Sequence, residues 1–596
     1  MVNAISSNSS ILGVDIETTS LAPRHGKIRL IQINDEKDTY IVDCKAFDYE
    51  YARLAKLSAI LSDPNRKLII QNRKFEHSWF LYHMGFQTQT VFDTYLASIL
   101  IDFRGKHGLD TLAKKYLVGV DMSKAEQASD WSGELSESQL NYAAEDVAYL
   151  HELRRVLLEK LQATSQLEAA KLEFDVVPSV ASMESNGMPI DYDQYFALVE
   201  RNKSIRDDKA KILLEFLQTR GGKRPIPKKI YQEDIFGTLL GVHSSNDINI
   251  DSWQQVLPIY QEVGVPITST SEKYIAPLVG EYPEIGYLLD YRGYAKLAST
   301  YGDEFLKSIE GDTLYTGYNQ FGTVTARFSG RKPNLLTIPK DKEYRSAFRV
   351  PEDQTFLTFD YSQMELRILA AYSRDSVMLD SYNTAKDLHS LTTANIFGLP
   401  YDEVVAKAKG EHKEKRDAGK ILNFSVIYGI SPTALMLRLQ GAGIPATEDY
   451  CKTLIDGFYK TYKGAARWLY EREKQVLYDP TLRSVAGHLM KVDIDKNDKK
   501  SVNKAKRDAR NYLIQCGNAC ATKRAMTGLY KDIVNKSLPM KIRNVVHDEL
   551  NVTCDSSYTD EAQALVKYHM EEAGSFYFPA VKIEAEGHPG SSWADK

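Results

Sequence analysis

The stretch 357–367, which reads LTFDYSQMELR, constrains the fold most strongly because its hydrophobic period changes in the middle. The run 355–359 is rich in Thr, Phe and Leu, a composition that suits a short strand. From Met364 onward the apolar residues follow the spacing of an amphipathic helix. The pattern therefore predicts a strand that passes directly into a helix, with Asp360 at the junction and Glu365 just inside the helix.

A second carboxylate, Asp548, stands in a comparable setting far downstream. The segment 542–552, IRNVVHDELNV, reads as two apolar-rich strands joined by a bend at His547 and Asp548. Two aspartates on adjacent strands suit a pair of Mg²⁺ ions about 3.5–4 Å apart, the arrangement used for phosphoryl or nucleotidyl transfer. Either aspartate alone is typical of a strand end or a turn, so this interpretation requires that the two converge.

Length and composition indicate several globular domains. A chain of 596 residues is too long for one core, and two to four domains are expected. Hydrophobic residues make up 43% and charged residues 26%, which is ordinary for a globular protein. No apolar run approaches the roughly 18 residues of a membrane span, and the N-terminus has no secretory pattern. We therefore expect no membrane association.

Five cysteines are spread along the chain without a CxxC pair and without a nearby histidine pattern. They are Cys44, Cys451, Cys516, Cys520 and Cys554. This spacing argues against structural zinc and against a disulfide framework, and it suits a reducing compartment.

The net charge of −5 does not by itself indicate nucleic-acid binding. An acidic enzyme can still bind DNA if its charges are segregated. Basic clusters occur at 220–229 and 499–510. Each is equally compatible with phosphate binding and with a solvated surface.

Paired acidic residues also occur near the N-terminus. The segment that starts at Ile11 reads as a strand, on which Asp15 and Glu17 project from the same face. Tyr142 and Asp146 lie four residues apart on a helix expected to open at residue 141 and to run through Leu157. These patterns suit a metal site, although DxE is common and the helix is equally compatible with a plain surface helix.

A third pattern combines cations and aromatics at helical spacing. Arg416, Lys420, Phe424 and Tyr428 recur every four residues, which places them on one slowly drifting stripe. The two cations suit the binding of a triphosphate, and the positive end of the helix dipole also attracts the phosphate charge. The two aromatic rings offer flat surfaces for a sugar and a base. Such stripes are usually packing surfaces, but this order of cations and aromatics is uncommon.

These motifs together resemble those of family A DNA polymerases of the bacterial large-fragment type. The resemblance rests on DYSQMELR, on the segment 416–429 and on VHDEL at 546–550. The pairs Asp15/Glu17 and Tyr142/Asp146, with the segment 124–132, resemble DEDDy 3′→5′ exonucleases. The resemblance implies a DNA-directed DNA polymerase with a proofreading exonuclease, acting in DNA replication or repair.

The fold implied by the resemblance is a multidomain chain of α/β and α+β class. A ribonuclease H-like exonuclease domain is expected over 1–163, followed by a right-hand polymerase domain over 164–596. The thumb is expected at about 192–310, the palm at about 311–385 and 501–596, and the fingers at about 386–500. Because the first motif begins near residue 11, no 5′-nuclease domain is expected. No linker rich in Pro, Gly or Ser separates the two domains, so they are expected to pack rigidly.

The resemblance also implies roles at the polymerase site. Asp360, Asp548 and the backbone carbonyl of Tyr361 would bind two Mg²⁺ ions, with Mn²⁺ as an alternative. Glu365 would exclude a ribose 2′-OH, and Lys420 would bind the phosphates and act as general acid. The other expected nucleotide contacts are Gln363, His389, Arg416, Phe424 and Tyr428. Phe at 424 implies poor use of dideoxynucleotides, and a lone histidine such as His389 is otherwise more often structural.

The expected DNA contacts lie on both sides of the fingers segment. Arg327 would approach the primer terminus. Arg507, Asn511 and Gln515, again four residues apart, would meet minor-groove acceptors that are similar in every correct base pair. His547 would support the primer end, and Glu549 is assigned a minor role.

At the exonuclease site, the resemblance implies that Asp15, Glu17 and Asp146 bind two metal ions and that Tyr142 orients the attacking water. Glu76 stands where the family usually has Asp. The extra methylene moves the carboxylate by about a bond length, and positioning errors near 1 Å can cost on the order of 100-fold in rate. Weakened proofreading is therefore expected. Asp93 is expected to be structural.

The expected partners are primer–template DNA, deoxynucleoside triphosphates and a single-stranded DNA 3′ end. A monomer is expected, in the cytoplasm of a bacterial or phage-infected cell or in an organelle, and an accessory processivity factor is left open. Two alternatives remain. One is a ribonuclease-D-like exonuclease whose C-terminal part only binds nucleic acid, and the other is an inactive replication scaffold. Primer extension distinguishes both from a polymerase.

Overall fold

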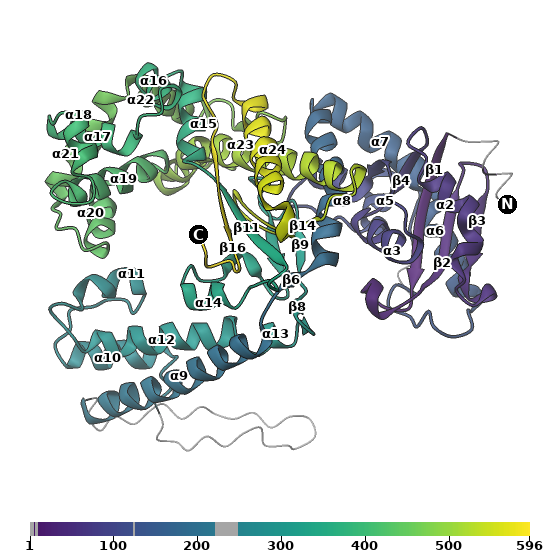
Figure 1. Cartoon of the computed structure of the whole chain (residues 1–596), viewed down its shortest axis with the longest axis horizontal. Helices are drawn as coiled ribbons and strands as arrows, with labels where there is room; N and C mark the ends of the chain where they lie inside the picture. Colours follow the sequence, from purple (N-terminus) through teal and green to yellow (C-terminus); the bar gives the residue numbers. More distant parts are fainter. Residues whose placement is uncertain (1–4, 6–9, 123–125, 221–247) are drawn as a thin grey trace.

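The computed structural model describes residues 5, 10–122, 126–220 and 248–596. Nearly all of the basic cluster at 220–229, and Lys124 of the segment 124–132, lie outside these residues. Figure 1 shows a sheet-containing N-terminal domain on one side, a second sheet at the centre, and two groups of helices beyond it.

The N-terminal domain is built on a five-stranded sheet in the order β3-β2-β1-β4-β5. β1, β2 and β3 pair antiparallel, and β4 and β5 continue the sheet in parallel with β1. Apolar side chains of β1, β2 and β4 form a core with Trp79 and Phe80 of α3. The strands are β1 (Ile11–Thr18), β2 (Ile28–Asn34), β3 (Thr39–Asp43), β4 (Lys67–Ile70) and β5 (Thr90–Asp93).

The helices of this domain differ from the sequence expectation in one place. The single helix expected to open at residue 141 is two helices, α6 (Glu137–Ala148) and α7 (Leu150–Ala163). α6 starts earlier because Ser136 and Gln139 form a reciprocal capping box. Tyr149 then separates the helices, although the apolar spacing continues across it. The others are α2 (Ala55–Leu61), α3 (Lys74–Met84), α4 (Thr94–Ile101) and α5 (Leu109–Tyr116).

The helix α8 (Leu167–Asn186) joins the N-terminal domain to the rest of the chain. One apolar cluster contains Leu153 and Leu157 of α7, Phe174 of α8 and Tyr512 of the later helix α23 (Lys499–Asn535). The buried guanidinium of Arg73, at the start of α3, donates to the carbonyl oxygen of Phe174 (2.8 Å). The two parts therefore share a packed core, as expected from the absence of a linker.

The central sheet has the order β14-β15-β11-β16, and all its neighbours are antiparallel. α23 and α24 pack on one another beside it. Gly587 of β16 leaves room for the ring of Phe359, because a Cβ there would lie 2.2 Å from that ring. The elements are β11 (Gln354–Tyr361), β14 (Met540–Val546), β15 (Glu549–Asp555), β16 (Ala585–Gly590), α23 (Lys499–Asn535) and α24 (Thr559–Tyr577).

The segment expected as the thumb, 192–310, is mainly helical where it is described, and it ends with the short strand β7 (Ile309–Glu310). Its long helix α9 begins at Tyr192 and ends at Arg220, close to the expected 193–219. α9 packs along α12, and Leu213, Leu217, Tyr260 and Leu288 form a separate core there. The other helices are α10 (Trp253–Glu262), α11 (Glu272–Ile275), α12 (Ile285–Thr300) and α13 (Asp303–Leu306).

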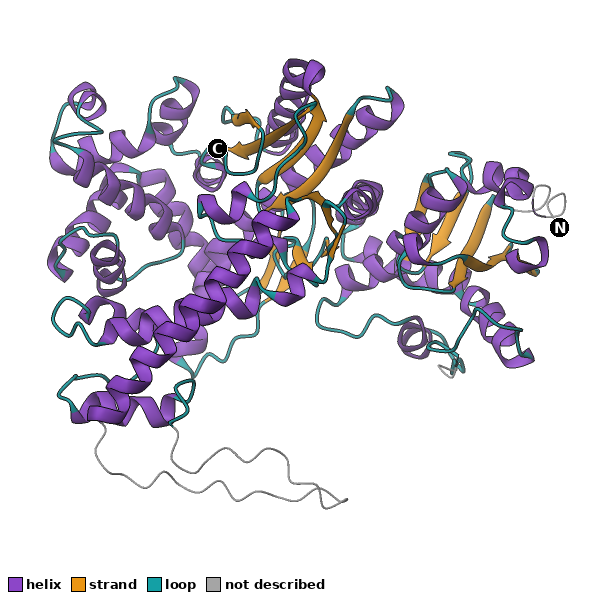
Figure 2. Cartoon of the chain, turned by 60° about the horizontal axis from the view of Figure 1, so that its bottom comes forward, coloured by secondary structure: helices purple, strands orange, loops and turns teal. Residues whose placement is uncertain are grey.

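The helices expected as the fingers lie on the same side of the central sheet as this group, away from the N-terminal sheet (Figure 1). Figure 2 shows the two larger sheets separated by helices. The helices from the strand junction onward are α15 (Met364–Ser373), α16 (Ser376–Asn383), α17 (Leu388–Phe397), α18 (Tyr401–Ala406), α19 (Lys413–Ile427), α20 (Pro432–Gly441), α21 (Glu448–Thr461) and α22 (Lys463–Gln475).

Short elements complete the description. They are α14 (Lys342–Ser346), β6 (Met188–Pro189), β7 (Ile309–Glu310), β8 (Thr313–Leu314), β9 (Gly317–Asn319), β10 (Ser329–Arg331), β12 (Thr481–Arg483) and β13 (Leu489–Lys491). Within the described ranges, no helix is both long enough and apolar enough to cross a bilayer.

Candidate active sites

Asp360 and Asp548 converge at one end of the central sheet. Asp360 is near the end of β11 and lies opposite Glu549 in the ladder with β15. Asp548 occupies the tight bend between β14 and β15, where His547 adopts a left-handed backbone with φ of 61°. Burial and, to a smaller extent, the nearby charge of Asp360 together raise the pKa of Asp548 to about 7. The expected strand-to-helix junction and the expected hairpin thus bring the two carboxylates together.

Lys596 provides a contact that the sequence did not predict. Its ammonium donates to Asp360 Oδ2 (2.7 Å) and to Glu549 Oε2 (2.8 Å). Glu549 is buried and also accepts from Trp593 Nε1 (2.6 Å) and lies 3.5 Å from Arg345 Nη1. Glu549 therefore anchors the C-terminal segment beside the aspartates, which is more than the minor role expected for it. No local motif signals this contact, because its partners are far apart in sequence.

Glu365, in the first turn of α15, is held by two donors from other segments. Tyr428, which follows α19, donates through its hydroxyl to Glu365 Oε2 (2.5 Å), and Arg327 Nη2 donates to Oε1 (2.6 Å). The charge of Glu365 also contributes to the raised pKa of Asp548. The C-terminal end of α19 therefore meets the carboxylate pair, and three residues predicted separately form one network.

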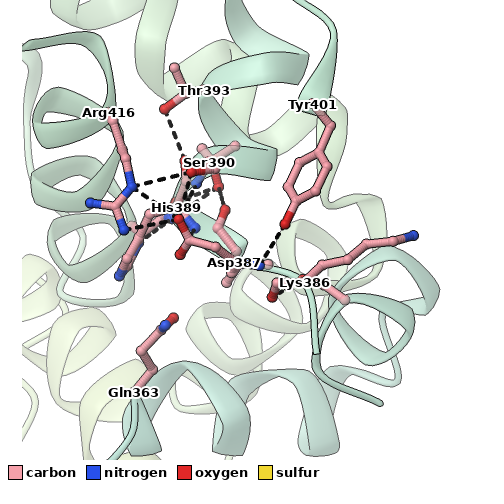
Figure 3. Close-up of polar contacts among 12 residues, drawn as sticks. Gln363, Lys386, Asp387, His389, Ser390, Thr393, Tyr401 and Arg416 are labelled. Carbon is pink, nitrogen blue, oxygen red and sulfur yellow. Dashed lines mark hydrogen bonds and ion pairs between the residues drawn. The ribbon is translucent and has the colours of Figure 1, made fainter. Parts of the chain in front are cut away.

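The start of the α19 stripe meets α17. Arg416 pairs with Asp387 (2.9 Å), which also caps α17 by accepting from the backbone N–H groups of His389 and Ser390. Figure 3 shows Arg416 pointing toward Asp387 and Ser390, with Gln363 set apart from this cluster. Gln363 accepts through Oε1 from Tyr382 (3.1 Å). The stripe thus starts at an ion pair between two helices.

The middle of the stripe is formed by Lys420 and Phe424. Lys420 is exposed, and the ring of Phe424 lies 5.5 Å from that of His389. His389 is buried, and its Nδ1 is 3.0 Å from Asn423 Nδ2. Burial lowers the pKa of His389 to about 4, so its imidazole is neutral at pH 7. The middle of the stripe therefore presents an exposed lysine and an aromatic ring beside the neutral imidazole of His389 on α17.

The residues expected to contact DNA lie on α23 and beside the hairpin bend. Arg507, Asn511 and Gln515 fall on α23 as expected, and Gln515 hydrogen-bonds to Tyr428. The Oδ1 of Asn511 is buried without a hydrogen-bond partner among the described atoms. Burial lowers the pKa of His547, and the charge of Arg327 lowers it further. Gln515 of α23 therefore contacts the network at Glu365 through Tyr428.

A second carboxylate cluster lies in the N-terminal domain. Asp15 and Glu17 of β1 meet Asp146 of α6, with ligand oxygens within 4.8 Å of one another. Burial raises the pKa of Asp15 to about 7. Burial together with the charges of neighbouring carboxylates raises the pKa of Glu17 to about 9 and that of Asp146 to about 8. Tyr142 hydrogen-bonds to Asp146, and buried Glu76 hydrogen-bonds to Asp15. All five predicted residues therefore come together.

Asp93 has a structural position, as expected. It caps α4 by accepting from the backbone N–H of Leu96 (3.0 Å), and it also accepts from the backbone N–H of Arg73 (2.9 Å). Both of its oxygens are used in fixing the starts of α3 and α4.

The argument against a metal site at the cysteines is not supported by the fold. Cys516 and Cys520 lie on α23, and His488 lies close to both, although it is remote from them in sequence. Motif spacing could not reveal this histidine, because it is brought in by tertiary packing.

Comparisons with known proteins match both parts of the chain. The family model "DNA polymerase family A" matches residues 235–595, and the model "3′-5′ exonuclease" matches residues 2–162. DNA polymerase I of Aquifex aeolicus (strain VF5) is 29% identical, over 98% of this chain and 96% of that protein. DNA polymerase I of Borreliella burgdorferi is 27% identical over 98% of this chain, which spans 62% of that longer protein.

A solved structure shows the same fold. The POL domain of Pol1 from M. smegmatis, in complex with DNA primer-template and dNTP, has a TM-score of 0.82 over 100% of this chain and 98% of that chain, at 24% identity. The family A model covers more than half of the sequence. The protein therefore belongs to DNA polymerase family A and has a 3′-5′ exonuclease domain ahead of its polymerase domain.

Proposed function

We propose that this DNA polymerase extends the 3′-OH of a DNA primer by two-metal-ion nucleotidyl transfer at Asp360 and Asp548, and that it proofreads at Asp15, Glu17 and Asp146. The observation that carries the proposal is the convergence of Asp360 and Asp548 beside the Glu365–Tyr428 end of α19. In this proposal residues 1–163 form the exonuclease domain and 164–596 the polymerase. The thumb is 192–310, the palm 311–385 and 501–596, and the fingers 386–500.

The donor set at the palm fits divalent cations. Asp548 is a buried carboxylate beside a second carboxylate, and the ammonium of Lys596 supplies a positive charge at Asp360. Hard oxygen donors of this kind suit Mg²⁺, with Mn²⁺ as a substitute. Asp360, Asp548 and the carbonyl oxygen of Tyr361 would hold two ions, with Lys596 displaced. When bound, such ions lower the pKa of the attacking hydroxyl and neutralise charge on the leaving pyrophosphate.

The fingers residues would bind and orient the incoming nucleotide. Arg416 and exposed Lys420 supply positive charge along α19, and Lys420 would protonate the leaving pyrophosphate. His389, neutral at pH 7, would donate a hydrogen bond to the β-phosphate. Phe424 would lie against the sugar and Tyr428 against the base. Gln363, at the start of α15, would add a polar contact to the phosphates.

Glu365 would exclude ribonucleotides by occupying the space of a 2′-OH. Its two donors, Tyr428 and Arg327, fix its position, so the carboxylate cannot rotate away without losing both hydrogen bonds. A fixed side chain discriminates better than a mobile one, because the added hydroxyl then meets a filled volume.

The DNA would bind as a primer–template duplex along α23. Arg507, Asn511 and Gln515 would donate to minor-groove acceptors, while Arg327 and His547 would support the primer terminus. Reading the minor groove in this way checks base-pair shape without reading sequence.

The exonuclease site would bind a single-stranded DNA 3′ end. The three carboxylates with raised pKa values fit divalent ions, which would relieve their mutual repulsion. Tyr142, through its hydroxyl near Asp146, would orient the attacking water. Glu76 would act by positioning Asp15, to which it hydrogen-bonds. We further propose a monomer in a reducing compartment such as the cytoplasm, which suits five free, buried cysteines.

The experiment that tests both activities together is extension of a primer with a mismatched 3′ end, with Mg²⁺ and dNTPs. The wild type is expected to excise the mismatch and then extend the primer. Asp15→Ala is expected to lose excision while it still extends a matched primer. Excision without extension would favour the ribonuclease-D-like alternative, and neither activity would favour a scaffold. Equal excision by wild type and Asp15→Ala would contradict the exonuclease assignment.

A further inference from the structure

A buried cluster of one histidine and two cysteines lies where the exonuclease domain joins the palm, outside both active sites. His488 directly precedes β13, whereas Cys516 and Cys520 are four residues apart on α23. One ligand atom from each residue lies within 4.8 Å of those of the other two. All three side chains have an exposed fraction of 0%. The position excludes a role as an accessible nucleophile, because no substrate can reach the thiols.

We propose that His488, Cys516 and Cys520 bind a structural zinc ion. Zinc prefers thiolate and imidazole ligands, at about 2.3 Å and 2.0–2.1 Å, which in tetrahedral geometry puts sulfur and nitrogen about 3.6 Å apart. The observed distance from His488 Nδ1 to Cys520 Sγ is 3.7 Å. Residues four apart on a helix lie on the same face, so α23 presents both thiols to the imidazole.

The other nitrogen of His488 has the partner that metal-binding histidines usually have. Nε2 lies 2.9 Å from Glu173 Oε1, on α8. A carboxylate at this position orients the ring through Nε2, so that Nδ1 faces the cysteines and would bind the ion in its deprotonated form. Glu173 is itself buried, and it accepts from Gln320 Nε2 (2.9 Å) and from the ammonium of Lys523. The imidazole is therefore oriented by a complete hydrogen-bond network.

The charges at the cluster balance when zinc is bound. Two thiolates neutralise a divalent ion, while Glu173 and Lys523 neutralise each other. Ser484 Oγ, 3.2 Å from Nδ1, is a further protein donor facing the cluster. A buried thiolate needs a partner of opposite charge, which zinc provides.

The site would fasten three segments that meet at the domain junction. Glu173 belongs to α8, which leaves the exonuclease domain, and His488 belongs to the β12–β13 hairpin. The cysteines belong to α23, which also carries Arg507, Asn511 and Gln515. Zinc at this position therefore stabilises the helix on which the proposed minor-groove contacts lie, although it contacts neither active site.

The test measures metal content of the full chain, expressed with Zn²⁺ and dialysed against EDTA to remove ions from the carboxylate sites. One zinc ion per chain is expected in the wild type and in Cys451→Ser, a control cysteine that is equally buried on α21. Cys516→Ser and His488→Ala are expected to lose it. Zinc retained equally in all four proteins would overturn the proposal.

A second measurement requires no variant and so does not depend on whether the variants fold. The wild type is prepared with Co²⁺ in place of Zn²⁺, and its absorption is recorded. Thiolate-to-cobalt charge-transfer absorption is expected, and removal of the ion with a strong chelator is expected to lower the melting temperature. A wild type that carries no thiolate-bound ion would overturn the proposal, whatever its polymerase activity.

Discussion

Glu365 has two hydrogen-bond donors, Tyr428 and Arg327, and this arrangement predicts graded effects on sugar selection. Glu365→Ala opens the volume that a 2′-OH requires, and we expect the ratio of ribonucleotide to deoxynucleotide incorporation to rise by at least about 10-fold. Tyr428→Phe removes only one donor and is expected to give a smaller rise. Single-nucleotide incorporation kinetics with rNTPs and dNTPs measure both. An unchanged ratio in Glu365→Ala would remove Glu365 from this role.

His77 predicts a pH dependence of stability in the exonuclease domain. It is fully buried, with Nδ1 2.8 Å from Thr88 Oγ1, and burial lowers its pKa from 6.5 to about 3. Below pH 6.5 the unfolded chain binds a proton that the folded chain does not bind, so stability falls as the pH drops from 6.5 toward 3. Between pH 7.5 and 5.5 this loss is about 1.4 kcal/mol.

His77→Asn tests this linkage, since asparagine keeps a polar group near Thr88 but does not titrate. Urea unfolding at pH 7.5 and 5.5 is expected to show that the wild type loses about 1.4 kcal/mol more than the variant over this interval. An equal loss in both proteins would mean that His77 is protonated in the folded state.

At the scale of elements, Asp387 joins α17 to α19. It caps α17 and pairs with Arg416, the first residue of the proposed nucleotide-binding stripe (Figure 3). Asp387→Ala is expected to destabilise the protein by about 1–2 kcal/mol, because both the cap and the partly buried ion pair are lost. It should also raise the KM for dNTPs, since Arg416 loses its fixed position.

The matched control is Asp380→Ala, which removes a more exposed carboxylate paired with Lys386. A change below about 0.5 kcal/mol is expected there. Urea unfolding and steady-state kinetics compare the two variants. If Asp387→Ala changed the free energy of unfolding and the KM for dNTPs as little as Asp380→Ala does, the contact between α17 and α19 would contribute little to the stability of the helices proposed as the fingers.

The elements that could be predicted from sequence are those with a local signal. β11 and α15 were predictable because the hydrophobic period changes at Asp360, and the β14–β15 hairpin because two apolar runs flank a polar bend. The break at Tyr149 between α6 and α7 was not predictable, since the apolar spacing continues across it. The start of α6 does have a local signal, namely the Ser136–Gln139 capping box.

At the scale of the whole molecule, the exonuclease and polymerase domains share a core and are expected to stabilise each other. Arg73 of α3 donates to carbonyl oxygens of Phe174 (2.8 Å) and Thr88 (2.5 Å). Arg73→Met leaves these buried acceptors unpaired and is expected to cost more than about 2 kcal/mol. Arg53→Met, at an exposed ion pair with Glu50, is the control and should be nearly neutral. A similar, small loss in the free energy of unfolding in both variants would contradict the claim that the two domains stabilise each other through Arg73.

Contacts between segments that are far apart in the sequence could not be predicted from local sequence patterns. Lys596 beside Asp360, and His488 beside Cys516 and Cys520, are formed by tertiary packing and have no motif. Asp360 and Asp548, the proposed metal ligands, were predictable because each lies in a recognisable local pattern. Their convergence was a hypothesis that only the sheet register could test, and β11 pairs with β15 at the required position.

The most direct test of the account is single-turnover primer extension by Asp548→Asn with saturating DNA and dNTP. We expect the rate to fall by at least about 1,000-fold, because a neutral amide cannot replace a metal-binding carboxylate, while DNA binding and exonuclease activity at Asp15 stay intact. A rate within about 10-fold of the wild type would contradict the claim that Asp360 and Asp548 together form the polymerase site.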